Sequence, residues 1–181
     1  MRTYCWDIET TDLKADIGSL IVVCFGELDN EGHISRFMVE DIQSIGRGTV
    51  AQREKKLAQW ALARYAECDI LIGHNSLAFD RHFLNGVAFR HRLGLVPKKV
   101  MHIDTYQAAR GSLAMSGSMR NLVDIMGIGV KDAPSKDDWR NANQGDANAL
   151  ARVRERCIAD VKMTAEMWLR LKHVFLAKWG K

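Results

Sequence analysis

The stretch "TYCWDIETTDL", residues 3–13, begins as an apolar strand and then places two acidic residues, Asp7 and Glu9, one position apart. In a β-strand, side chains at i and i+2 project from the same face, so these two carboxylates lie side by side. Adjacent carboxylates repel each other, and a cation that bridges them makes the pair favourable. A solvated strand end is the alternative explanation, and for this short pattern alone it is the commoner one.

The composition is that of an ordinary globular protein. The 181 residues predict one domain spanning 1–181, and 47% hydrophobic with 27% charged residues is typical of a soluble chain. The longest apolar runs, such as residues 20–25, are too short to span a bilayer, and no secretion signal is expected. The net charge of +4 permits nucleic-acid binding without indicating it. Four scattered cysteines without a CxxC pair argue against structural zinc and favour a reducing, cytoplasmic location: Cys5, Cys24, Cys68 and Cys157.

The order of predicted elements indicates an α/β fold. Alternating or apolar runs predict strands at 3–8, 19–28, 33–40, 69–73 and 99–105, with a turn at 29–32. Helical periodicity predicts helices at 50–68, 79–94, 116–128 and about 147–178, with a short helix after residue 105 and a polar loop at 129–148. Three strands, then alternating helices and strands, then helices, predict a mixed sheet covered on both faces.

A third acidic residue lies on the face of the last helix that should be buried. Asp160 belongs to a stripe with spacings of 4, 3, 4, 3 and 4, formed by Val153, Cys157, Asp160, Thr164, Met167 and Leu171. A buried carboxylate without a partner costs several kcal/mol, so Asp160 needs a cation. A structural ion pair with a nearby arginine and a bound metal both satisfy this need.

A fourth acid follows in "GHNSLAFD", residues 73–80. Asp80 is expected at the start of a helix, after a buried strand and a turn that contains Asn75. The helix dipole alone explains a carboxylate at that position. Taken with Asp7, Glu9 and Asp160, however, it predicts a cluster of four acids that repel one another without metal. Two divalent cations about 3.5–4 Å apart in such a cluster form a site for in-line phosphoryl displacement.

The ordered segments "WDIETTDL", "IGHNSLAFD" and "RCIADV" resemble the three motifs of the DEDD 3′–5′ exonucleases. The resemblance continues through "HIDTYQAA" at 102–109 and "SMRNLVDIMGI" at 118–128, so it covers essentially the whole chain. It is greatest to the proofreading exonucleases of family-B DNA polymerases and to small stand-alone relatives. The resemblance implies a ribonuclease H-like fold, whose mixed central sheet has three antiparallel strands followed by parallel strands, with helices on both faces.

The same resemblance implies roles for individual residues. It assigns Asp7, Glu9, Asp80 and Asp160 as catalytic metal ligands for two Mg²⁺ or Mn²⁺ ions, one activating the attacking water and the other supporting the leaving 3′ oxygen. It also implies a set of residues that contact the terminal nucleotide: Thr10, Thr11, Leu13, Asn75 and Phe79.

The third motif departs from the family pattern. Relatives carry a tyrosine four residues before the last aspartate or a histidine five before it, where this chain has Arg156 and Glu155. Arginine stays protonated and cannot act as a base, so Arg156 would clamp the scissile phosphate or hold Asp160 in an i,i+4 ion pair. Three explanations stay open: metal activation of water suffices, His82 or His74 fills the role, or the protein binds nucleic acid without cleaving it.

Basic and aromatic residues predict how the substrate is held. Most basic side chains of 81–99 and of the last helix should be solvated, and a subset would contact phosphates. Phe79 and Trp139 are candidates for stacking on bases, although Trp139 would equally serve to anchor its loop. Segments 112–118 and 129–148 are expected to form the mobile walls of a single-strand channel.

The sequence therefore predicts a 3′–5′ exonuclease that acts on the 3′ ends of single-stranded nucleic acid and releases nucleoside 5′-monophosphates. DNA is the expected substrate and RNA the alternative. The other alternative is a nucleic-acid-binding subunit with weakened catalysis. A polymerase or another replication or repair protein is the expected kind of partner, and no membrane association is expected.

Overall fold

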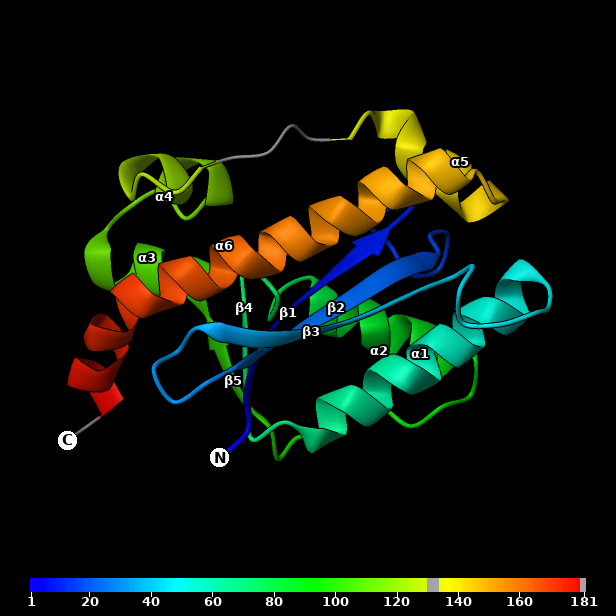
Figure 1. The fold of residues 1–181 in the computed structure, drawn as a ribbon. Coiled ribbons are helices and arrows are strands. Elements are labelled where there is room, and N and C mark those ends of the chain that lie inside the picture. Colours follow the sequence, from blue (N-terminus) through cyan, green and yellow to red (C-terminus); the bar gives the residue numbers. More distant parts are fainter. Residues whose placement is uncertain (130–133, 180–181) are drawn as a thin grey trace.

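The computed structural model describes residues 1–129 and 134–179, which form a five-stranded sheet with helices on both of its faces (Figure 1). The strand order is β3-β2-β1-β4-β5. β1, β2 and β3 are antiparallel neighbours, whereas β4 and β5 run parallel to β1, which confirms the predicted mixed sheet. The strands are β1 (Thr3–Thr10), β2 (Leu20–Leu28), β3 (Ile34–Asp41), β4 (Ile70–Gly73) and β5 (Met101–Asp104).

β1 is the central strand, and its second half has a free edge. The strand extends beyond the predicted 3–8 to Thr10, so Asp7 and Glu9 both lie within it. β4 pairs with β1 only through Thr3–Cys5. The later part of β1 is therefore bonded to β2 on one side, and its other edge is open to groups from elsewhere in the chain.

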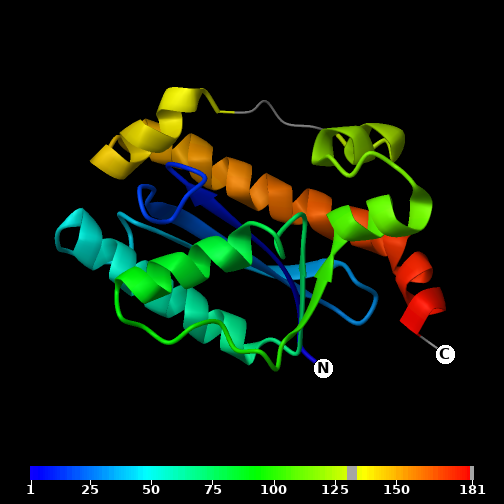
Figure 2. The same ribbon diagram turned by 180° about the vertical axis from the view of Figure 1, so that it is seen from behind.

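The helices form two layers. α6 crosses one face of the sheet and contacts β1, β2 and β3, whereas α1 and α2 pack together on the opposite face (Figures 1 and 2). α3, α4 and α5 contact α6 along its length. The helices are α1 (Val50–Glu67), α2 (Asp80–Arg90), α3 (Thr105–Leu113), α4 (Met119–Ile125), α5 (Lys136–Gln144) and α6 (Ala147–Trp179).

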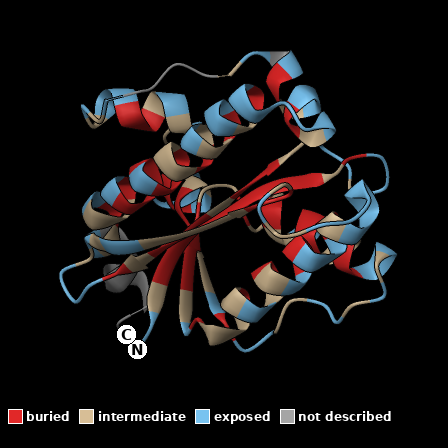
Figure 3. Ribbon diagram, turned by 45° about the vertical axis from the view of Figure 1, so that its right-hand side comes forward, coloured by how far each residue is buried: buried red, intermediate tan, exposed pale blue. Residues whose placement is uncertain are grey.

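The core lies on both sides of β1 and β2, whose ribbons are mostly coloured as buried in Figure 3. On the α1 side, Trp6 stacks on Phe25 and meets the edge of Tyr65, with ring centroids 5.9 and 5.4 Å apart. On the α6 side, every member of the predicted stripe that contains Asp160 is buried. The four cysteines are buried free thiols.

The predicted end of α2 is wrong. The helix expected over 79–94 ends at Arg90, because Arg92 adopts a left-handed backbone conformation (φ 56°) and the N–H of Leu93 bonds to the carbonyl of Ala88. Gly94 lies beyond that end and does not terminate the helix.

The polar loop expected over 129–148 contains a helix, α5, in its described part; residues 130–133 lie outside the described residues. The Asp138 carboxylate accepts the Ser135 backbone N–H at 2.7 Å at the start of α5, and Gly145 ends it with a φ of 103°. Ala142 is fully buried, so α5 is held by packing as well as by its ends. Among the described helices of the chain, none has both the length and the apolar character needed to cross a bilayer.

Candidate metal centre

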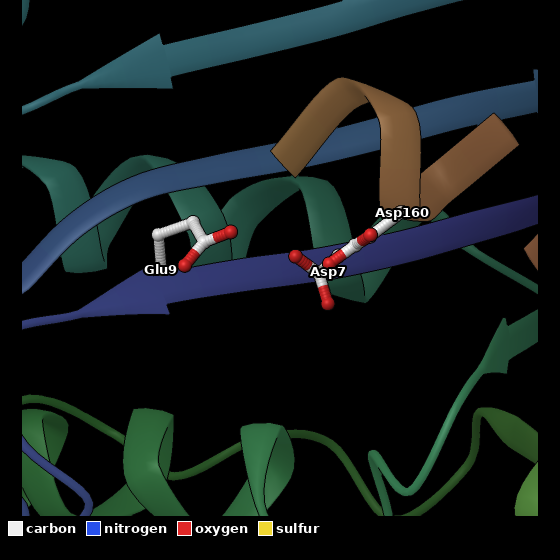
Figure 4. Close-up of side chains that lie close together, drawn as sticks. All are labelled: Asp7, Glu9 and Asp160. Atoms are coloured by element: carbon white, nitrogen blue, oxygen red, sulfur yellow. The ribbon is translucent and has the colours of Figure 1, made fainter. Parts of the chain in front are cut away.

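Three of the predicted acids converge at the end of β1. Asp7 and Glu9 project from β1 and Asp160 from α6, toward one another (Figure 4). One carboxylate oxygen from each lies within 4.8 Å of the other two. Asp160 reaches this point because the buried stripe of α6 faces the sheet directly over β1.

Asp160 is bonded through one oxygen only. Arg156, one helical turn earlier, brings its Nε to 2.9 Å from Oδ2 of Asp160, which is the expected i,i+4 ion pair. The other oxygen, Oδ1, is buried and has no hydrogen-bond partner among the described residues. An unpartnered buried carboxylate oxygen is costly, and a cation at that point would remove the cost.

Asp80 lies next to this trio but outside it. Its carboxylate is buried at the start of α2, and Oδ1 accepts the Ile8 backbone N–H at 3.1 Å across the open edge of β1. That hydrogen bond fixes the Asp80 carboxylate beside Asp7. The charge of Asp80 raises the pKa of Asp7 more than the charge of Asp160 or Glu9 does.

The protein compensates the charges of the cluster only in part. Desolvation, followed by the charges of Asp80, Asp160 and Glu9, holds the pKa of Asp7 well above its usual range. Burial raises the pKa of Glu9 to about 8, of Asp80 to about 7 and of Asp160 to about 6, although hydrogen-bond donors act in the opposite direction on each. Four oxygen-ligand side chains with a surplus of negative charge fit hard divalent cations such as Mg²⁺ or Mn²⁺.

Glu9 has a partner that the sequence did not reveal. The indole Nε1 of Trp139 donates to Oε2 of Glu9 at 2.6 Å. Trp139 is half-buried on α5, so this part of the expected loop is packed against the acidic cluster. A stacking role on bases stays a prediction, whereas the anchoring alternative agrees with this contact.

The residues after β1 form a tight turn with an exposed apolar tip. The Thr10 hydroxyl donates to the Asp12 carbonyl at 2.7 Å, and the Thr11 hydroxyl accepts the Ser19 N–H at 2.8 Å. Leu13 is 80% exposed. Both hydroxyls therefore shape the turn, and the Leu13 side chain is available to an incoming molecule.

The loop between β4 and α2 holds Asn75 and Phe79. Asn75 adopts a left-handed conformation (φ 59°), and its backbone N–H donates to Asp104 at 2.9 Å. Phe79 is half-buried and packs against Phe83, with ring centroids 5.8 Å apart. Asp104 also accepts the Leu77 N–H at 3.0 Å, so one buried carboxylate shapes the loop.

A half-buried histidine, His102 on β5, supports the same loop. Nε2 of His102 faces both the Trp6 indole N–H, at 3.3 Å, and the Ser76 hydroxyl, at 2.9 Å. Because an indole only donates, Nε2 is an acceptor, and Nδ1 carries the proton toward the Tyr65 hydroxyl at 3.2 Å. Burial lowers the pKa of His102 to about 4, so the ring is neutral at physiological pH. The sequence signal for these supports is "HID" at the end of β5, which in the sequence contributes only to the resemblance.

The other candidates for a water-orienting group are not part of the trio. His74 bonds through Nδ1 to the Thr105 hydroxyl at 2.9 Å, and burial lowers its pKa. His82 is exposed on α2, and Glu155 is exposed on α6. The role of each in catalysis stays a hypothesis.

The sheet order and the helices on its two faces define the ribonuclease H-like fold seen in exonuclease domains, as predicted. No family model matches the sequence, and no curated protein matches it either. Solved structures do match. Exonuclease I of E. coli in complex with a dT13 oligonucleotide has a TM-score of 0.68 at 14% identity, covering 99% of this chain and 42% of that one.

Two further structures have the same fold. The family B DNA polymerase from the hyperthermophilic archaeon Pyrobaculum calidifontis has a TM-score of 0.75 at 14% identity, covering 95% of this chain and 24% of the polymerase. An ExoI/SSB-Ct complex has a TM-score of 0.66 at 14% identity, covering 99% of this chain and 43% of that one. This chain thus spans less than half of exonuclease I and about a quarter of the polymerase. The likeness establishes the fold.

Proposed function

We propose that residues 1–181 form a metal-dependent 3′–5′ exonuclease domain that removes nucleotides from single-stranded nucleic acid. The observation that carries the proposal is the convergence of Asp7, Glu9 and Asp160, with oxygens within 4.8 Å of one another and Asp80 beside them. Because a fold alone does not define a reaction, the proposal is based on this acidic site, and the likeness to exonuclease I supports it.

The four carboxylates are the groups that would hold two Mg²⁺ or Mn²⁺ ions. When bound, such ions lower the pKa of a coordinated water and stabilise negative charge at a phosphate. The unpartnered Oδ1 of Asp160 and the raised carboxyl pKa values of the cluster are the features that fit this assignment.

The proposed reaction is hydrolysis at the 3′ terminus. The oxygen of a water molecule bonds to the terminal phosphorus, and the bond from that phosphorus to the preceding 3′ oxygen breaks. A nucleoside 5′-monophosphate leaves, and the 3′ oxygen takes up the proton that the water gives up, so the shortened strand ends in a 3′ hydroxyl.

The chain's own residues would hold the strand for this reaction. Leu13, from the turn after β1, and Asn75 and Phe79, from the loop before α2, are the side chains proposed to contact the terminal nucleotide. Thr10 and Thr11 contribute by fixing the turn that carries Leu13. Arg156 keeps its guanidinium beside Asp160, where it can also contact the scissile phosphate.

We propose DNA as the substrate, with RNA as the alternative. Exonuclease I, which has this fold, is seen with a dT13 oligonucleotide, and a DNA polymerase contains the same fold over about a quarter of its chain. The latter also supports a polymerase or another replication or repair protein as a partner.

A second candidate function is a subunit that binds nucleic acid without cleaving it. The ion pair between Arg156 and Asp160 favours it, because a guanidinium already supplies part of the positive charge that a metal would bring.

A labelled oligonucleotide separates the two functions. A 5′-labelled single-stranded DNA incubated with Mn²⁺ should give a ladder that shortens one nucleotide at a time from the 3′ end, and Asp7→Ala should give none. Release of the label as a mononucleotide without a ladder would contradict the polarity, and intact DNA under every metal would favour the binding subunit. An RNA of the same sequence, run in parallel, determines the substrate class.

A further inference from the structure

The hydrogen bond between Trp139 and Glu9 joins two parts of the chain that lie 130 residues apart. Glu9 is 8% exposed at the end of β1, and the 2.6 Å distance is short for a bond from a neutral donor. One oxygen of this carboxylate is therefore held by the protein.

The helix that carries Trp139 is itself anchored. Asp138, the preceding residue, is buried and accepts two hydrogen bonds from the Arg152 guanidinium of α6, the one from Nε being 3.1 Å long. One helical turn later in α5, the Gln43 side chain donates to the carbonyl of the buried Ala142. The indole is thus held by α6 and by the segment after β3, rather than by a freely moving loop.

We propose that Trp139 is a positioning residue that orients the Glu9 carboxylate for metal binding, so that α5 is a structural part of the metal centre. This inference rests on the proposed function. An indole N–H only donates, so it fixes the rotation of the carboxylate without becoming a metal ligand itself. Donors to a ligating carboxylate commonly change metal affinity by 10–100-fold when they are removed.

The test uses Mn²⁺ alone, without nucleic acid, and counts bound ions by electron paramagnetic resonance. Trp139→Phe keeps a ring and removes the N–H, and it should weaken Mn²⁺ binding by about 10-fold or more. Trp60→Phe is the matched control, because Trp60 is a half-buried tryptophan that packs against Phe25 on the far side of the sheet. Glu9→Gln should weaken binding at least as much as Trp139→Phe.

A second measurement detects the hydrogen bond directly. In a ¹H–¹⁵N spectrum, the indole signal that disappears in Trp139→Phe should shift when Mg²⁺ is added and also in Glu9→Gln, whereas the signal of Trp60 should stay. If Trp139 only packed beside the cluster without bonding to Glu9, its signal would not shift on addition of Mg²⁺.

The outcomes separate this inference from the proposed function. If wild type binds Mn²⁺ and Trp139→Phe binds it equally well, the positioning role is wrong and the proposed function stands. If neither wild type nor any variant binds Mn²⁺, the proposed function fails, and the inference fails with it.

Discussion

The guanidinium of Arg156 lies 2.9 Å from one oxygen of Asp160, while the other oxygen of the same carboxylate is buried and has no hydrogen-bond partner in the described part of the chain. The two oxygens thus have different surroundings: a fixed positive charge neutralises one, and the other faces the acidic cluster. The side chain at position 156 therefore affects the charge of Asp160. It also stands at the motif position where some exonucleases of the resembled family carry a tyrosine.

Replacing Arg156 by tyrosine should leave turnover unchanged or raise it by up to roughly 100-fold, because a phenol can orient a water molecule and a permanently protonated guanidinium cannot accept its proton. The rate of shortening of 5′-labelled DNA in Mn²⁺ measures this. The control is Arg36→Tyr, which removes an exposed arginine of β3 that pairs with Glu27 of β2. Loss of turnover only in Arg156→Tyr would make Arg156 a working catalytic residue.

Asp7→Asn should stabilise the metal-free protein and abolish its response to metal. Removing one of several mutually repelling, desolvated charges is expected to raise the free energy of unfolding in EDTA by about 1–2 kcal/mol. Urea unfolding with EDTA or excess Mg²⁺ measures both effects, since the wild type should gain stability from Mg²⁺ and Asp7→Asn should not. Asp124→Asn, at an exposed position on α4, should change neither value. A variant that is less stable than wild type in EDTA would show that repulsion is not the dominant effect.

His102 should make the protein sensitive to mild acid. Its folded-state pKa is about 4, below the ordinary value of 6.5, so between these values the unfolded chain binds a proton that the folded protein does not. Stability is therefore present above pH 6.5 and is lost as the pH falls toward 4, by about 3 kcal/mol in total.

Urea unfolding at pH 7 and pH 5 tests this contribution. Protonation of the carboxylates changes the stability of wild type and of His102→Gln alike, and the glutamine cannot titrate. The informative quantity is therefore the difference between the two proteins in how much stability they lose. Wild type should lose about 2 kcal/mol more than the variant between the two pH values. Equal losses would mean that burial does not hold the ring neutral.

Glu54 should be the main support of the turn that carries Leu13. Its buried carboxylate accepts the Leu20 N–H at 2.9 Å and pairs with Arg90 and His91, each at 2.6 Å. Arg90 in turn donates to the carbonyl of Gly18, at the end of that turn. Glu54→Gln leaves part of this network without its charge and should lower the free energy of unfolding by about 3 kcal/mol.

Hydrogen exchange of the amides near Gly18 should also become faster in Glu54→Gln, because the turn loses its support. Glu27→Gln removes a more exposed ion pair with Arg36 and should cost at most about 1 kcal/mol. If the two variants were equally stable, the buried network would not be what holds the turn.

Local patterns were sufficient for much of the fold and for the acids. The two-residue period of β1 put Asp7 and Glu9 on one face, and the 3.6-residue period of α6 put Asp160 in the buried stripe. Both periodicities belong to the backbone geometry of a single element, so they can be recognised without knowing the neighbours. For α5, the pairing of Ser135 with Asp138 and the glycine at 145 were readable signals, but the many polar residues of this segment favoured a loop.

Only the tertiary structure decided which distant groups complete the site. The bond from Trp139 to Glu9, the loop held by Asp104 and the neutral state of His102 all depend on side chains that approach from separate elements. Asp80 likewise reaches β1 only because β4 leaves the edge of β1 open after Cys5. Such contacts arise from how the layers pack against each other. The sequence around either partner has no periodic pattern that would indicate them.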